Sequence, residues 1–101
     1  MNPFTRKRVL KLVVDGVVTE VGRHTPRTRL GPIPAPEEAY FALELTAARL
    51  TDGRERSPSS IVPAEFAGDI ALLEQFSVGD KVRITATTAT GQLIETMVKL
   101  D

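Results

Sequence analysis

Residues 9–21 limit the fold more than any other segment, because they combine β-branched side chains with few good helix formers. The run reads Val-Leu-Lys-Leu-Val-Val-Asp-Gly-Val-Val-Thr-Glu-Val, a composition typical of a strand. Gly16 lies in its middle, where a glycine predicts a β-bulge. We therefore expect one long strand that bends at Gly16 and pairs with neighbours on both sides.

Two later segments alternate between apolar and polar residues, as half-buried strands do. In the first, Phe41, Leu43, Leu45 and Ala47 are predicted to face inward, and Tyr40, Ala42, Glu44 and Thr46 are predicted to face outward. The second covers residues 81–89, with Val82, Ile84 and Ala86 inward and Arg83, Thr85 and Thr87 outward. After a tight connection at residues 90–91, residues 92–100 are expected to form the last strand.

The remaining segments connect these strands. Residues 22–38 hold four prolines and predict a long loop, and the Asp-Gly of residues 51–54 predicts a turn. Residues 59–63 are expected to form a short, weak strand whose end or edge is Pro63. Asp69 is a suitable N-cap for a short helix over residues 69–76, whose buried stripe would be Ile70, Leu72, Leu73 and Phe76.

The predicted order is three strands, a helix and two strands. This order indicates an all-β chain, specifically a five-stranded OB-fold, which is a Greek-key barrel, with one short helix between strands 3 and 4. An open β-sandwich or an SH3-like barrel also uses short alternating strands, but the position of the helix favours the OB-fold. The domain would span residues 9–101, after a basic N-terminal arm at residues 1–8.

Composition excludes several classes of protein and of site. The 101 residues fit one domain, the absence of cysteine excludes disulfides and zinc–thiolate sites, and the single histidine excludes a multi-histidine metal cluster. No apolar run approaches the about 18 residues of a membrane span. We therefore expect a cytoplasmic protein with no membrane partner and no cofactor.

The zero net charge hides an asymmetry along the chain. Residues 1–30 hold seven Lys and Arg against two Asp and Glu, whereas residues 31–101 hold six against eleven. Such a division suggests a basic surface for a polyanion. The alternative is that charges in a short chain segregate by chance and only solvate its faces.

Several motifs resemble the bacterial single-stranded DNA-binding proteins and the related primosomal replication protein. The similarity covers most of residues 10–90, through Gly16-Val17-Val18, residues 21–31 with Val-Gly-Arg-His-Thr, Phe41-Ala42-Leu43-Glu44, Glu65-Phe66-Ala67-Gly68, and residues 76–84 with Gly-Asp-Lys-Val-Arg-Ile. The resemblance implies binding of single-stranded DNA during replication, recombination or repair, as a dimer or tetramer and beside other replication or recombination proteins.

The chain departs from that family in its aromatic residues and in its tail. It has no tryptophan, and the alternation turns only Tyr40 clearly outward, while Phe41 and Phe76 occupy core positions and Phe66 is not assigned. The long tail with an acidic tip is missing from the sequence given. The chain would thus be a divergent binder, or an OB domain used for contacts with proteins.

The candidate nucleic-acid-binding residues are mostly arginines. Arginine pairs two phosphate oxygens at once and also stacks on bases. The candidates are Arg23, Arg27 and Arg29 of the loop at 22–38, Arg6, Lys7 and Arg8 of the arm, Arg54 and Arg56 near the turn at 51–54, and Tyr40 as a stacking platform. The alternatives are solvated charges, pairing of the last two arginines with Asp52 and Glu55, and a tyrosine that packs beside the proline-rich loop.

The pattern indicates non-catalytic binding of single-stranded nucleic acid, in the first place DNA, with little sequence preference. Catalysis is not expected, because His24 has no cysteine or Ser–Asp pair at a suitable spacing and the glycines are scattered. The alternatives are a protein-interaction or assembly subunit and, as a third, a binder of small ligands or oligosaccharides. A homo-oligomer is expected because a small sheet has exposed edges.

Overall fold

The computed structural model describes residues 10–25, 36–87 and 92–100, which form six strands and two short 3-10 helices. The expectation of a mainly β chain is confirmed. In chain order the elements are β1 (Lys11–His24), β2 (Glu38–Leu50), β3 (Glu55–Arg56), η1 (Pro58–Ser60), β4 (Glu65–Asp69), η2 (Ile70–Glu74), β5 (Lys81–Thr87) and β6 (Leu93–Lys99).

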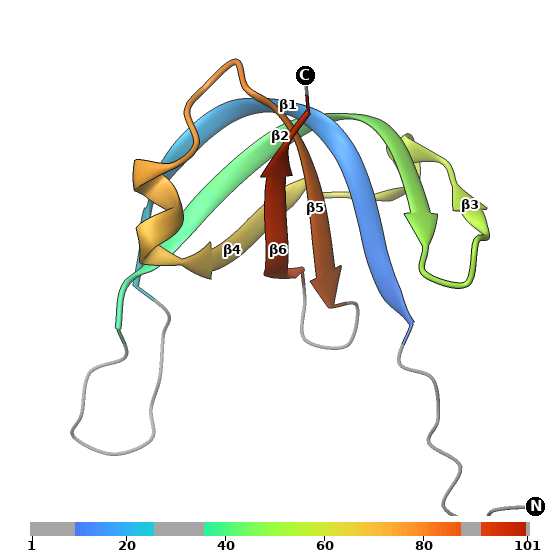
Figure 1. The fold of residues 1–101 in the computed structure, drawn as a ribbon, viewed down its shortest axis with the longest axis horizontal. Helices are drawn as coiled ribbons and strands as arrows, with labels where there is room; N and C mark the ends of the chain where they lie inside the picture. Colours follow the sequence, from blue (N-terminus) through green and yellow to red (C-terminus); the bar gives the residue numbers. More distant parts are fainter. Residues whose placement is uncertain (1–9, 26–35, 88–91, 101) are drawn as a thin grey trace, which may run out of the picture.

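Five of these strands close into a ring. The long strand β1 pairs antiparallel with β2 on one side and with β5 on the other, as expected for residues 9–21. β2 continues to β4 and β5 continues to β6, and a parallel pair between Ala67 and Leu93 joins β4 to β6. Figure 1 shows β1 and β2 curving together across the molecule, while the two-residue β3 extends only the far edge of β2.

The pairing of β1 with β2 is irregular at Gly16, where the sequence predicted a bulge, and again between Val18 and Glu20. Asp15 pairs with Ala47 but Gly16 pairs with Leu45, so the extra residue is Thr46 of β2 rather than a residue of β1. This bulge also shifts the alternation of β2. Ala47, predicted inward, is therefore only half-buried, and Ala48 takes the buried position.

The interior of the ring holds the large apolar side chains. Phe41 is fully buried and Phe76 is nearly so, as predicted, and their rings meet edge to face with centroids 6.3 Å apart. Phe66, which the sequence did not assign, is also in the core at 1% exposure. The predicted inward residues of β5 are all buried, namely Val82, Ile84 and Ala86.

The predicted third strand at residues 59–63 is wrong. Pro58–Ser60 form η1, residues 61–63 form a bend, and the third strand of the ring is β4 at Glu65–Asp69. Proline has no backbone N–H to donate to a ladder, and Pro58 and Pro63 lie just before and at the end of this segment. The strand therefore begins after Pro63.

The predicted helix and the predicted long loop are both shorter than expected. Asp69 caps η2 through a bond from the Ala71 amide at 2.9 Å, which confirms the N-cap, but η2 is a five-residue 3-10 helix with none of its residues fully buried. The loop was expected to begin at Gly22, yet residues 22–24 continue β1 and pair with β2. Cross-strand pairing extends a strand further than its local composition suggests.

An ion pair on the outer surface of the ring links β1 to β5. Arg83 donates from Nε to Asp15 Oδ1 at 2.7 Å and from its terminal nitrogen to Oδ2 at 2.9 Å, while the Asp15 side chain is 16% exposed. These hydrogen bonds, opposed by partial burial and assisted by the charges of Arg83 and Arg49, lower the pKa of Asp15 below its ordinary value. The carboxylate therefore stabilises the folded state.

We expect Asp15→Asn to lower the free energy of unfolding by about 1 kcal/mol at neutral pH, because charge-assisted hydrogen bonds are lost at a partly exposed site. A group whose pKa is lower in the folded state stabilises that state above its unfolded pKa and loses this contribution as the pH falls through the folded pKa. Urea unfolding should therefore show that the free energies of unfolding of the unmodified chain and of Asp15→Asn differ less near pH 2 than at pH 7.

The matched control is Asp52→Asn, which removes an aspartate whose partner, Arg54, is also exposed. Exposed ion pairs contribute little to stability. Equal stabilities of Asp15→Asn and Asp52→Asn at pH 7 would show that the bond between β1 and β5 does not stabilise the ring.

Candidate functional site

Tyr40 stands on the outer face of β2 between two small residues. Its cross-strand neighbours are Gly22 on β1 and Ala67 on β4, while the residues on either side of it along β2, Ala39 and Phe41, are buried. Alternate residues of a strand point to opposite faces, so the Tyr40 ring points outward. The ring is half-buried, and the residues on its two flanks, a glycine and an alanine, are small.

A pocket of about 380 Å³ opens beside this ring. Its lining comes from the end of β1, from β2 and β4, and from the residues before β4 and β6, namely His24, Tyr40, Pro63, Glu65, Phe66, Ala67 and Gln92. The volume lies in the lower part of the range typical of small-molecule sites. The described lining includes one histidine and no lysine or arginine.

Gln92 is held in a defined conformation at the edge of this pocket. Its backbone adopts φ of 62°, which is uncommon for a residue with a side chain. Its Nε2 donates to the carbonyl of Pro63 at 3.1 Å, and its own carbonyl accepts from the Ala67 amide at 3.3 Å. These bonds join the start of β6 to β4 next to Tyr40.

The Tyr40 hydroxyl interacts with carboxylates on the same face. Partial burial, a hydrogen-bonding interaction with Glu65 and the charges of Glu65 and Glu20 raise the pKa of Tyr40 above its ordinary value of 10.0. The phenol therefore stays neutral at physiological pH. A neutral phenol ring keeps both its flat apolar face and its O–H donor.

The same outer face is acidic. The register sets Glu20 beside Ala42 and Ala42 beside Glu65, and it sets Glu38 opposite Asp69. Together with Glu44 further along β2, these are five carboxylates on the outer face, and Glu65 is the one that lines the Tyr40 pocket. The alternation had placed Glu44 outward, but Glu65 and Asp69 were missed because β4 was not recognised. This surface repels phosphates and suits groups that donate hydrogen bonds.

The arginine candidates within the described residues do not meet at this pocket. Arg23 lies on β1 rather than in a loop, and its NH1 is 3.5 Å from Glu37 Oε1. Arg56 lies on β3, opposite Ala48 of β2. That position is eight residues from Tyr40, or about 26 Å along an extended strand.

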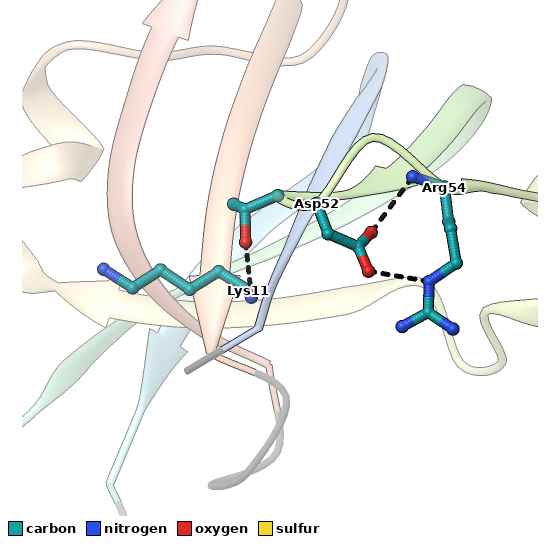
Figure 2. Close-up of polar contacts among 4 residues, drawn as sticks. Lys11, Asp52 and Arg54 are labelled. Carbon is teal, nitrogen blue, oxygen red and sulfur yellow. Dashed lines mark hydrogen bonds and ion pairs between the residues drawn. The ribbon is translucent and has the colours of Figure 1, made fainter. Parts of the chain in front are cut away.

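Arg54 is engaged within its own turn, as the alternative reading of the sequence expected. Its Nε is 2.7 Å from Asp52 Oδ2, and its amide donates to Oδ1 at 3.0 Å (Figure 2). The turn is tied to the start of β1, since the Lys11 amide donates to the Thr51 hydroxyl at 3.1 Å. Arg54 and Arg56 therefore belong to the end of β2 opposite Tyr40.

The other candidates, Arg6, Lys7, Arg8, Arg27 and Arg29, lie outside the described residues. The described ranges hold eight Lys and Arg against twelve Asp and Glu, whereas residues 1–9 and 26–35 hold these five bases and no acid. The positive charge of the chain is thus concentrated in those two segments. A polyanion would meet its cations there rather than on the sheet.

Comparison with protein-family models, with curated proteins and with solved structures finds no match. In the described ranges, no group of three His, Cys, Asp or Glu residues could hold a metal ion. Those same ranges contain no helix long and apolar enough to cross a membrane. The arrangement around Tyr40, an aromatic platform with hydrogen-bond acceptors at its rim, can bind a planar donor-bearing group.

Proposed function

We propose that this chain is an OB-fold that binds single-stranded nucleic acid without catalysis, in the first place DNA. The order of the ring supports this proposal. With the two-residue β3 set aside, the ring runs β1, β2, β4, β6 and β5, which are the first, second, third, fifth and fourth strands along the chain. The short helix η2 lies between the third strand, β4, and the fourth, β5. This is a Greek-key arrangement of five strands, as in OB-folds.

The observation that carries the proposal is the place of Tyr40. OB-folds bind oligonucleotides on the face of their second and third strands. In this ring those strands are β2 and β4, and Tyr40 stands on their outer face between Gly22 and Ala67. Stacking of one base on an aromatic side chain contributes about 1–3 kcal/mol and tolerates any sequence.

The proposal divides the contacts between two parts of the chain. The acidic sheet face contacts bases through Tyr40, and phosphates are bound by the basic segments that contain Arg27 and Arg29 and Arg6 to Arg8. Each phosphate neutralised by an arginine releases counterions, so affinity falls as salt rises. Binding with these features is steeply salt-dependent.

The test is fluorescence anisotropy with a labelled thymidine oligonucleotide of about 30 nucleotides at low and at near-physiological salt. Tyr40→Ala should weaken binding about tenfold with the salt dependence unchanged, because stacking is lost but no phosphate contact is. Tyr40→Phe should keep most of the affinity. Replacing Arg27 and Arg29 with alanine should weaken binding and lower the magnitude of the salt slope by about 1.4, since each phosphate contact to a single strand contributes about 0.7.

Arg54→Ala is the matched control for the arginine variants, because Arg54 pairs with Asp52 at the other end of β2. It should bind like the unmodified chain. No binding by the unmodified protein at micromolar concentration in low salt contradicts the proposal. We also propose that the chain is a dimer or tetramer, and light scattering on the same sample measures its oligomeric state.

A second function, docking of a protein partner, is favoured by the acidic face. Glu20, Glu38, Glu44, Glu65 and Asp69 would fit a basic polypeptide segment. Such a subunit would bind a lysine- and arginine-rich peptide in low salt and would not bind the thymidine oligonucleotide. The two functions are thus separated by which of these two ligands the unmodified chain binds.

A further inference from the structure

We infer that the Tyr40 pocket prefers guanine over the other bases and that Glu65 is the residue that recognises it. This inference rests on the proposed function, since it names the base that the same surface selects. Its starting point is the chemistry of the pocket rim, where the charged side chain is a carboxylate rather than a guanidinium.

Glu65 is placed to contact the edge of a base stacked on Tyr40. Glu65 pairs with Ala42, and the next outward residue of β4, Ala67, pairs with Tyr40. Glu65 is therefore the diagonal neighbour of Tyr40 on the same face, a separation of about 7–8 Å in antiparallel sheets. The charge of Glu65 also acts on the Tyr40 phenol, in agreement with this placement.

The polar groups at the rim favour a ligand that donates hydrogen bonds. An ionised carboxylate only accepts, and it has two oxygens. The Gln92 amide already donates to the Pro63 carbonyl. The two oxygens of Glu65 offer about four lone-pair sites, so its interaction with the Tyr40 hydroxyl leaves both oxygens able to accept from a base stacked on Tyr40.

Guanine matches this acceptor better than any other base. Its Watson–Crick edge carries two adjacent donors, the N1–H and the N2 amino group, which can reach both carboxylate oxygens together. Adenine and cytosine set an acceptor nitrogen beside their single amino group, and thymine and uracil flank one N–H with two carbonyl oxygens. Each of these bases would place an acceptor against the carboxylate.

The negative charge of Glu65 makes its contribution to binding depend on which base is bound and not on the phosphate backbone. Glu65 repels phosphates, so it adds nothing to the binding of a thymidine strand. It contributes only where a donor edge faces it. A preference produced in this way disappears when the carboxylate is replaced by an amide, while general binding remains.

The experiment measures the affinity of the full chain for labelled thymidine 10-mers with one central substitution. The central base is guanine, inosine, adenine, cytosine or thymine, and runs of guanine are avoided because they associate. We expect guanine to bind about tenfold more tightly than thymine, within the range of a bidentate contact to a base. Inosine, which lacks the N2 amino group, should lose most of that gain.

Glu65→Gln should reduce the guanine preference to less than twofold and leave the thymidine strand bound at least as tightly. Glu44→Gln is the matched control, because it removes the same charge from the same face at an exposed position four residues from Tyr40. It should keep the full preference. Thermal unfolding of both variants should show that they fold like the unmodified chain.

The outcomes separate this inference from the proposed function. Equal binding of guanine and thymine strands by the unmodified chain overturns the inference and leaves the proposed function standing. An equal loss of preference in Glu65→Gln and Glu44→Gln also overturns it, since general charge would then be the cause. No binding of any oligonucleotide overturns both.

Discussion

Phe41→Ala is expected to lower the free energy of unfolding by about 3–5 kcal/mol, the cost of removing a large buried aromatic side chain. Phe41 is fully buried at the point where β2 pairs with β1 and β4, opposite Val21 and Phe66. Its ring also meets Phe76 edge to face. A domain of this size is stable by about 5–15 kcal/mol, so the variant should be partly unfolded at 37 °C.

Urea unfolding followed by circular dichroism measures this effect, with Phe41→Leu as the milder comparison. A double-mutant cycle with Phe76→Leu isolates the contact between the two rings, which should be coupled by about 0.5–1.5 kcal/mol. A loss below about 1 kcal/mol for Phe41→Ala would mean that the core at β2 is not packed as described.

Gly16→Ala is expected to lower the free energy of unfolding by about 2–3 kcal/mol, through overpacking against a backbone that cannot yield. A Cβ at this position would lie 2.6 Å from the Glu44 carbonyl oxygen and 3.1 Å from Leu45 Cα. Both atoms belong to β2, which pairs here with β1 and is also held by β4 before this point and by β3 after it. The strand must shift, and the bulge at Thr46 shifts with it.

Gly22→Ala is the matched control, since it makes the same change in the same strand. There the nearest atom to a new Cβ is Tyr40 Cδ2 at 3.8 Å, an ordinary contact. Glycine to alanine without strain reduces the entropy of the unfolded chain, so this variant should be unchanged or stabilised by up to about 1 kcal/mol. Similar thermal midpoints for the two variants would contradict a close approach at Gly16.

The core could be predicted where local pattern decides the structure. The alternation at Val82, Ile84 and Ala86 identified buried residues, because successive side chains of a strand face opposite ways. Asp69 was identified as an N-cap because a short acceptor before an apolar run satisfies a free amide. These signals depend on residues only a few positions apart.

The candidate site could be predicted only in part. Tyr40 was found from alternation alone, but its partner Glu65 was not. β4 has small residues at Ala67 and Gly68 and shows little strand propensity, so its strand character comes from pairing with β2. Arg54 and Arg56 were named with Tyr40 as candidates for one nucleic-acid-binding surface, and the register of β2 separates them from Tyr40.

The amino-acid sequence alone indicated the β character of the chain, the irregularity at Gly16 and the division between a basic segment at residues 1–30 and an acidic remainder. These follow from side-chain sterics and from charge, which are properties of neighbouring residues. The folded chain was needed to show that Ala67 and Leu93 close the ring and that Glu65 lies beside Tyr40. Pairings between distant residues depend on the free energy of the whole sheet, and a local sequence pattern does not contain that free energy.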